Sequence, residues 1–229
     1  MNSFKKIKLK FFLLFILIFL LVFILLVLTR KIKLVECFSQ FGPCPDKIIA
    51  NLEQFKGQKL ISILSAEKIL NGLPNKETIK SLKISRRLPN VLVITIALRQ
   101  PISRIDSKVL DKKATIDDEG VVIGIVNASV LPYLKTTQKY LPGDILDKPT
   151  LSAALVLKKI SELQNQSLEG EFTLPVVKIK LKESLVLLDV YHLADNWDDS
   201  LQKILVQSKI DSKLPKIIDL RYTQPVLTY

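Results

Sequence analysis

The longest apolar segment of the chain lies near its N-terminus. Residues 11–28 consist only of Phe, Leu, Ile and Val, with no polar stripe that would suit a helix on the surface of a soluble core. As a helix, this run would extend roughly 27 Å, which is close to the hydrocarbon thickness of a bilayer. The pattern predicts a transmembrane helix over residues 11–29, with a cytoplasmic tail over residues 1–10.

A cleaved secretory signal is the alternative interpretation of this segment. Such a signal usually has a shorter apolar region that is followed by small residues at the cleavage site. Here the run is followed by Thr29, Arg30 and Lys31, so we expect an uncleaved anchor. Basic residues flank the run on both sides and slightly favour a cytoplasmic N-terminus, with the bulk of the chain outside the cytoplasm.

Residues 30–103 alternate between extended and helical patterns. A short strand from Lys33 to Cys37 is followed by a helix that begins at Asp46 and ends near Gly57. A second helix is predicted over Ala66–Leu70, and strands follow over Ile79–Ser85 and over residues 91–99. The order strand, helix, helix, strand, strand predicts a compact α+β unit.

The clearest strand of this unit is the stretch Val91 to Arg99. Leu92, Ile94 and Ile96 fall on one face, and Pro89 and Pro101 stand outside its two ends, where a missing N–H does no harm. The pattern predicts a buried, antiparallel strand.

Residues 104–229 are rich in strand patterns. A hairpin is predicted over residues 115–123, helices after Pro149 and after Asp198, and alternating strands over residues 177–181 and 185–190. Two terminal strands, Ile217–Tyr222 and Val226–Tyr229, complete the segment. The fold class is therefore α+β: a mainly antiparallel β domain with one or two helices follows the first unit.

The net charge of +12 raises the possibility of nucleic-acid binding. Seven of the 34 Lys and Arg residues lie in residues 1–33, which contain no acid, so the rest of the chain is basic by about five charges. Basic residues beside an apolar run serve topology and anionic headgroups. We therefore expect no nucleic-acid partner.

The two cysteines, Cys37 and Cys44, are separated by six residues. Without further Cys or nearby His they make a poor zinc site, and an exported location favours a disulfide between them. Two free thiols are the alternative if the compartment lacks an oxidant.

Groups for catalysis are sparse. The single His192 has no Cys or Ser elbow near it in the sequence, and the acids 117–119 fall in a predicted hairpin turn, where we expect them to be solvated. Asp198 and Asp199 suit the first turn of a helix better than a metal site. We expect no enzyme, no cofactor, no metal and no small-molecule substrate.

Several motifs in order resemble those of the bacterial cell-division protein family FtsQ, called DivIB in some bacteria. The residues that carry the resemblance are Gly57-Gln58-Lys59-Leu60, Arg87-Leu88-Pro89 with the following strand and Arg99-Gln100-Pro101, Asp118-Glu119-Gly120-Val121-Val122, Leu131-Pro132 and Ile218-Asp219-Leu220-Arg221-Tyr222. The resemblance covers nearly the whole chain. It implies a POTRA-like domain over residues 30–103 and an FtsQ-type β domain over residues 104–229.

The resemblance also implies a function. It predicts a non-enzymatic, single-pass scaffold of the division complex in the bacterial cell membrane, with bitopic partners of the FtsB and FtsL type. Arg221 and Tyr222 match the family's partner-binding strand, where an open sheet margin can be continued by a partner's strand. The alternative is that both residues merely finish the sheet.

Arg86 and Arg87 are a second candidate for partner binding, with a solvated turn as the alternative. The competing function is a POTRA-containing membrane adaptor for protein secretion or envelope assembly, and an exported enzyme is the third possibility.

Overall fold

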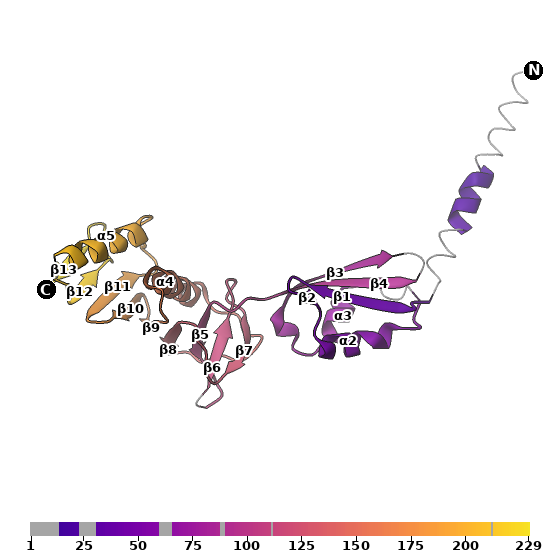
Figure 1. Ribbon diagram of the computed structural model, residues 1–229, viewed down its shortest axis with the longest axis horizontal. Helices are drawn as coiled ribbons and strands as arrows, with labels where there is room; N and C mark the ends of the chain where they lie inside the picture. Colours follow the sequence, from indigo (N-terminus) through magenta and orange to yellow (C-terminus); the bar gives the residue numbers. More distant parts are fainter. Residues whose placement is uncertain (1–13, 23–30, 60–65, 88–89, 111, 212) are drawn as a thin grey trace, which may run out of the picture. The chain divides into compact units, whose positions relative to one another are not determined.

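The computed structural model describes residues 14–22, 31–59, 66–87, 90–110, 112–211 and 213–229. The chain divides into two compact units, Met1–Leu98 and Arg99–Tyr229, each with its own sheet and core (Figure 1). Both units combine helices with strands, so the described chain is α+β.

The expected transmembrane helix over residues 11–29 is wrong as a description of this fold. The described helix covers residues 14–22, a length of 9 residues. Nine residues extend only about 14 Å, which is less than half of a bilayer core. None of the helices in the described ranges is long and apolar enough to cross a membrane. The remaining parts of the predicted span, and the predicted tail over residues 1–10, lie outside the described residues.

The first unit is built on a four-stranded sheet. The strands stand in the order β2-β1-β4-β3, with β1 and β4 parallel and the other neighbours antiparallel. Their bounds are β1 Leu34–Ser39, β2 Gly42–Pro43, β3 Ile79–Arg87 and β4 Val91–Leu98.

Short helices cover one face of this sheet. They are α2 Asp46–Leu52, the 3-10 turn η1 Glu53–Phe55, α3 Ala66–Asn71 and the 3-10 turn η3 Lys76–Thr78. One buried cluster joins these helices to the sheet. It contains Leu52 of α2, Phe55 of η1, Ile69 of α3 and the inward-facing side chains of β4. Burial of these apolar side chains supplies most of the favourable free energy of the unit.

The strand β4 buries the row of apolar side chains that the sequence predicts, but only one of its two neighbouring strands is antiparallel to it. Leu92, Ile94 and Ile96 are buried in the core. The strand lies antiparallel to β3 but parallel to β1, so the expectation of a purely antiparallel strand is wrong. A parallel neighbour requires a long crossover, and the helical segment between β1 and β3 supplies it. Pro89 lies outside the described residues.

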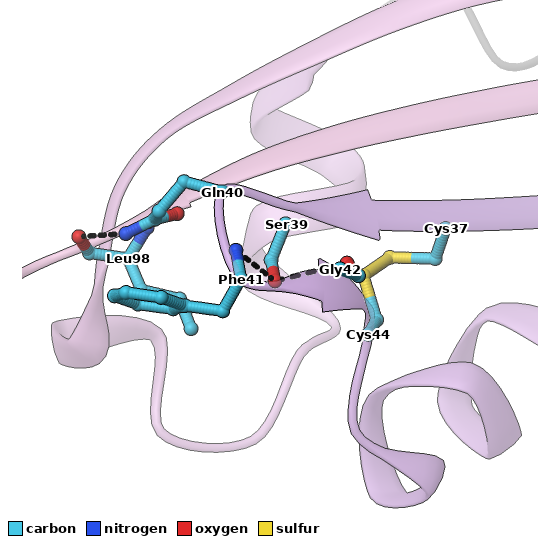
Figure 2. The surroundings of a disulfide bond; sticks show 7 residues. All are labelled: Cys37, Ser39, Gln40, Phe41, Gly42, Cys44 and Leu98. Carbon is cyan, nitrogen blue, oxygen red and sulfur yellow. Dashed lines mark hydrogen bonds between the residues drawn. A yellow bond between two sulfur atoms is a disulfide. The ribbon is translucent and has the colours of Figure 1, made fainter.

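A disulfide between Cys37 and Cys44 joins the two arms of the β1–β2 hairpin, on the side of the paired residues away from the turn (Figure 2). Both cysteines are buried, and the backbone N–H of Cys44 donates to the carbonyl of Cys37 at 3.1 Å. Within this loop, the side-chain amide of Gln40 donates to the carbonyl of Leu98 at 2.8 Å and accepts from its N–H at 2.9 Å. The amide therefore takes the place of a backbone partner at the end of β4.

The second unit is built on a nine-stranded sheet in the order β13-β12-β11-β10-β9-β8-β5-β6-β7. Five of the neighbouring pairs are antiparallel and three are parallel, so the sheet is mainly antiparallel. Its strands are β5 Ser103–Asp106, β6 Lys113–Ile116, β7 Val122–Val126, β8 Tyr133–Thr136, β9 Glu169–Thr173, β10 Val176–Leu181, β11 Ser184–Asp189, β12 Ile217–Asp219 and β13 Val226–Thr228.

Two helices pack on this sheet, α4 Lys148–Gln164 and α5 Trp197–Ile210. The carboxylate of Asp147 caps α4 by accepting from the N–H of Thr150 at 2.7 Å, and Pro149 lies in the first turn. Leu157 and Ile160 of α4 and Leu201 of α5 are buried against the strands. The helices after Pro149 and after Asp198 are where the sequence pattern predicts them.

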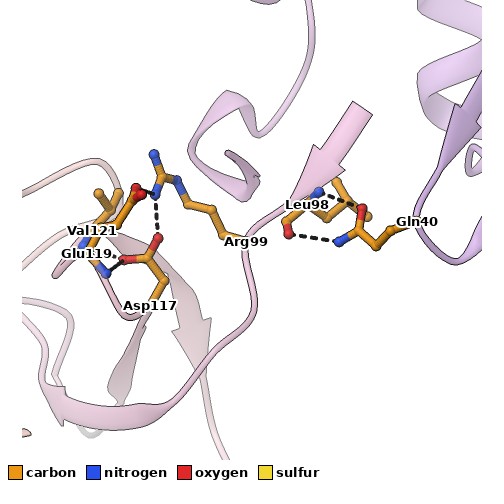
Figure 3. A network of polar contacts seen from close by, with 6 residues as sticks. All are labelled: Gln40, Leu98, Arg99, Asp117, Glu119 and Val121. Atoms are coloured by element: carbon orange, nitrogen blue, oxygen red, sulfur yellow. Dashed lines mark hydrogen bonds and ion pairs between the residues drawn. The ribbon is translucent and has the colours of Figure 1, made fainter. Parts of the chain in front are cut away.

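The hairpin of β6 and β7 turns around a buried carboxylate. Asp117 accepts from the backbone N–H groups of Glu119 and Val121, and its other oxygen pairs with the guanidinium of Arg99 (Figure 3). Arg99 also reaches Glu119 at 2.8 Å. The prediction of a solvated acidic turn is wrong for Asp117, which is fully buried, because the turn needs an acceptor for its inward N–H groups.

Candidate partner-binding edge

The last two strands of the second unit differ from the predicted pair. The first of them, β12, ends at Asp219, so Arg221 and Tyr222 lie in the turn that follows it and not on a strand. The final strand β13 folds back antiparallel to β12, pairing Ile217 with Thr228. The margin of β12 that the sequence predicts to be open is therefore covered by the chain's own backbone.

The outermost strand is β13, which ends the described sheet. We call β12, the turn over residues 220–225 and β13 the C-terminal edge. Val226 and Tyr229 keep 50% and 53% of their surface exposed, whereas Leu227 packs on the core. An edge strand with one side paired presents its other backbone groups to solvent or to another chain.

A bidentate ion pair holds the start of the turn. The Nε of Arg221 lies 2.9 Å from one oxygen of Asp219, and its Nη2 lies 2.6 Å from the other. The backbone N–H of Arg221 also donates to the Asp219 carboxylate, at 3.1 Å. Two parallel N–H···O bonds fix the plane of a guanidinium, so this pair sets both the direction of the side chain and the shape of the turn.

Burial and pairing set the charge state of Asp219. Only 7% of this residue is exposed. The hydrogen bonds from the Arg221 guanidinium lower the pKa of the Asp219 carboxyl, and they outweigh the burial that would raise it. The same hydrogen bonds raise the pKa of Arg221, so the pair is fully ionised at neutral pH.

The pairing changes the role expected of Arg221. The motif resemblance assigns Arg221 to partner binding, but its guanidinium already holds the carboxylate of Asp219. Its central carbon also lies 5.7 Å from the centre of the Tyr222 ring, within the range of a cation–π contact. Arg221 therefore orients the turn and the neighbouring tyrosine.

Tyr222 is the most exposed of the predicted partner-binding residues in this unit. Its exposed fraction is 58%, and its ring offers apolar area with a polar tip. Such side chains often dominate the binding energy of protein interfaces. The ring therefore suits contact with another protein.

A second carboxylate ends the neighbouring strand β11. Asp189 accepts from the backbone N–H of Tyr191 at 2.8 Å and lies 3.2 Å from Nδ1 of His192. Partial burial works to raise the pKa of Asp189, but these hydrogen bonds lower it overall. His192, the only histidine, thus belongs to a turn, and its side chain is exposed.

The tail of β13 makes one further contact. The ammonium of Lys213 lies 4.6 Å from the centre of the Tyr229 ring. This cation–π contact joins the last residue of the chain to the segment between α5 and β12.

The other predicted pair, Arg86 and Arg87, belongs to the first unit. Both are the last residues of β3 and both are exposed. A nitrogen of Arg87 lies 3.1 Å from Glu36 of β1, so its charge is partly balanced. The alternative of a solvated turn is right about exposure but wrong about secondary structure, because both residues continue the strand. Their assignment to partner binding stays a prediction.

The sequence reasoning missed Asp219 as the partner of Arg221. A signal for it was present, since Asp219 and Arg221 are two residues apart, and residues at this spacing lie on the same side of an extended chain. The sequence pattern predicts a strand over Val226–Tyr229, and β13 confirms it, but the pattern does not predict that this strand pairs with β12.

Across the described ranges, no three His, Cys, Asp or Glu side chains gather in a way that could hold a metal ion. The expectation of a protein without metal, cofactor or catalytic site stays a prediction.

Comparisons with known proteins do not assign a family. No protein-family model matches the chain, and no curated protein matches it. The resemblance to the FtsQ and DivIB family, with the roles it implies, therefore stays a prediction from the motifs.

Proposed function

We propose that this chain is a non-enzymatic scaffold that binds partner proteins, with the C-terminal edge as one binding site. A strand of the partner would pair with β13 and extend the nine-stranded sheet, while Tyr222 would supply apolar contact beside it. The motif resemblance makes bitopic division proteins of the FtsB and FtsL type the first candidates, and the bacterial septum the first candidate location.

One observation carries the proposal: the sheet ends in an exposed three-residue strand next to a turn that is fixed by the ion pair of the buried Asp219 with the partly exposed Arg221. The strand provides backbone donors and acceptors, and the fixed turn holds an aromatic side chain close to them. A preorganised site of this kind loses less conformational entropy when a partner binds.

A second binding mode has its own support. Because β13 pairs with β12 through only three residues, a longer partner strand could displace it and pair with β12 directly. In that mode, the partner would take the place that the sequence argument assigned to it. Both modes use the same edge, and they differ in whether β13 stays on the sheet.

Site-specific photo-cross-linking in cells tests the proposal. A photo-reactive amino acid replaces Val226 in β13, and a matched control carries it at Lys180, an exposed position of β10, which has a neighbouring strand on each side. We expect the probe at position 226 to cross-link to an FtsB- or FtsL-type protein and the probe at position 180 to give no such product. Equal products from both positions, or none from either, would contradict a binding site at this edge.

Localisation separates division from the alternative function. A fluorescent fusion of the full chain should collect at mid-cell before septation if the protein is a division scaffold. If depletion leaves septation normal but blocks protein export, the secretion or envelope-assembly adaptor is the better description.

A further inference from the structure

A second sheet edge lies in the first unit, at strand β3. In the described part of the chain β3 ends the four-stranded sheet, and only β4 pairs with it (Figure 1). It is 9 residues long, against 3 for β13. A long exposed edge strand is a template for pairing unless something prevents it.

The side chains of β3 form two distinct rows. Pairing with β4 places Lys83, Ser85 and Arg87 on the face away from the core, opposite Thr95, Val93 and Val91. All three are exposed. The segment Ile79–Arg87 contains no acidic residue, so this outer row is basic.

The other row faces the helices. Leu82 and Ile84 pair with the buried residues Ile96 and Ile94 and pack against the core, but both stay only partly buried. The apolar core therefore reaches the edge of the sheet without being closed there. A neighbouring strand could cover these two side chains with apolar residues of its own.

We propose that β3 binds an extended segment of a partner protein whose residues alternate between acidic and apolar side chains. Adjacent strands lie about 4.8 Å apart, so side chains opposite each other come into contact. Acidic residues of the partner would lie beside Lys83 and beside Arg87, whose charge Glu36 of β1 balances only in part. The apolar residues of the partner would lie beside Leu82 and Ile84. This site is in a different unit from the C-terminal edge and does not depend on it.

Charge also decides against a second copy of this chain as the occupant. Two β3 strands side by side would bring Lys83, Arg86 and Arg87 close to their equivalents, and like charges opposite each other destabilise a sheet. Basic side chains on an edge protect it from such pairing. They leave the edge open to a strand of opposite charge.

Peptide binding to the full chain tests the proposal. The chain is kept in a non-ionic detergent because of its apolar run, and a fluorescent eight-residue peptide that alternates glutamate with valine is added at low salt. We expect saturable binding by fluorescence anisotropy, and no binding of a peptide that alternates lysine with valine. Absence of binding by the glutamate peptide would overturn the proposal.

Charge-reversed variants test the basic row. The double variant Lys83→Glu/Arg87→Glu should weaken binding of the glutamate peptide about tenfold, because two favourable cross-strand pairs become repulsive. The matched control is Lys178→Glu/Lys180→Glu on β10, where both charges are also exposed on a strand, and its affinity should be unchanged. An equal loss in both double variants would show that net charge, and not β3, attracts the peptide.

N-methylated peptides test the backbone pairing. Two versions of the glutamate peptide carry methyl groups on one or the other alternating set of amides, so that each blocks one hydrogen-bonding edge. We expect one version to lose at least about tenfold in affinity and the other to retain more, because only one edge of a peptide can pair with β3. Equal affinity of all three peptides would rule out strand addition.

Binding to vesicles gives the remaining outcome. If vesicles of anionic phospholipid bind the chain and Lys83→Glu/Arg87→Glu abolishes that binding while the peptide never binds, then β3 contacts lipid, and the proposal is wrong. The cross-linking experiment at Val226 is unaffected by any of these results, so the failure of one site is distinguishable from the failure of the other.

Discussion

The edge strands β3 and β13 both have backbone groups that could pair with another chain, but they differ in length, in charge and in their exposed side chains. The strand β3 is long and basic and contains no acidic residue. Its neighbour β4 leaves the apolar side chains of Leu82 and Ile84 only partly buried. The strand β13 is short and has exposed apolar and aromatic side chains, next to a turn fixed by Asp219 and Arg221. A long charged edge can select its partner by charge pattern. A short edge must depend more on preorganised geometry and on apolar area.

The largest expected effect comes from the core beneath the β3 edge. Ile94→Ala in β4 removes a fully buried side chain and should lower the free energy of unfolding of the first unit by about 2–5 kcal/mol. Hydrogen exchange followed by mass spectrometry should show faster exchange in β3 and β4, and the glutamate peptide should no longer bind. Thr95→Ser, on the exposed side of β4, is the control and should leave both measurements nearly unchanged.

The next effect concerns the fixed turn of the C-terminal edge. Asp219→Ala removes the acceptor of three hydrogen bonds and leaves Arg221 without its partner, so it should cost about 2–3 kcal/mol in urea unfolding. The control Asp211→Ala removes an exposed carboxylate that accepts from Gln207, and it should cost less than about 0.5 kcal/mol. Equal costs would mean that the ion pair does not stabilise the edge.

The response to pH should separate the two edges further. The pKa of Asp219 is lower in the folded state than in the unfolded chain, so the folded state binds fewer protons between the two values. The stabilisation is therefore complete above about pH 5, where an unfolded Asp is almost fully ionised, and is lost as the pH falls through the lower folded pKa. Unfolding curves measured between pH 2 and about pH 7 should show this loss.

The variant Asp219→Asn should remove that part of the pH dependence, and Asp189, whose pKa is also lowered, would still contribute its own. The strand β3 contains no carboxyl group, so its own side chains contribute no loss of this kind. A pH profile that is identical in the wild type and Asp219→Asn would contradict the assignment.

The smallest expected effect on stability belongs to Arg87. Its side chain is 64% exposed and pairs with Glu36 at 3.1 Å. Exposed ion pairs contribute little, so Arg87→Gln should change the free energy of unfolding by less than about 1 kcal/mol. Binding of the glutamate peptide should nevertheless fall about twofold to threefold, because one cross-strand pair is lost. Binding that stays the same would remove Arg87 from the proposed site.

The sequence pattern predicts much of the fold where periodicity is strong. The inward row of β4, the two long helices of the second unit and the β6–β7 hairpin all follow from spacing and turn residues. The parallel pairing of β1 with β4 does not follow from them, because a two-residue period gives the faces of a strand but not the direction of its neighbour.

The candidate site was harder to predict than the fold. The sequence identified the segment around Arg221 and Tyr222, but not that Asp219 would bind Arg221 or that β13 would cover β12. Both depend on how the chain turns after Asp219, and a turn is set by only a few local hydrogen bonds. The length of the apolar run over residues 11–28 also exceeded the helix that the structure describes.

The amide of Gln40 has a consequence for self-association. It binds both the N–H and the carbonyl of Leu98, at a point where β1 has already ended. These two backbone groups are therefore not available to pair with a strand of another chain. The disulfide of Cys37 and Cys44 encloses Gln40 in its loop. The disulfide thereby helps to hold the Gln40 amide against the backbone of Leu98, which lies far along the sequence.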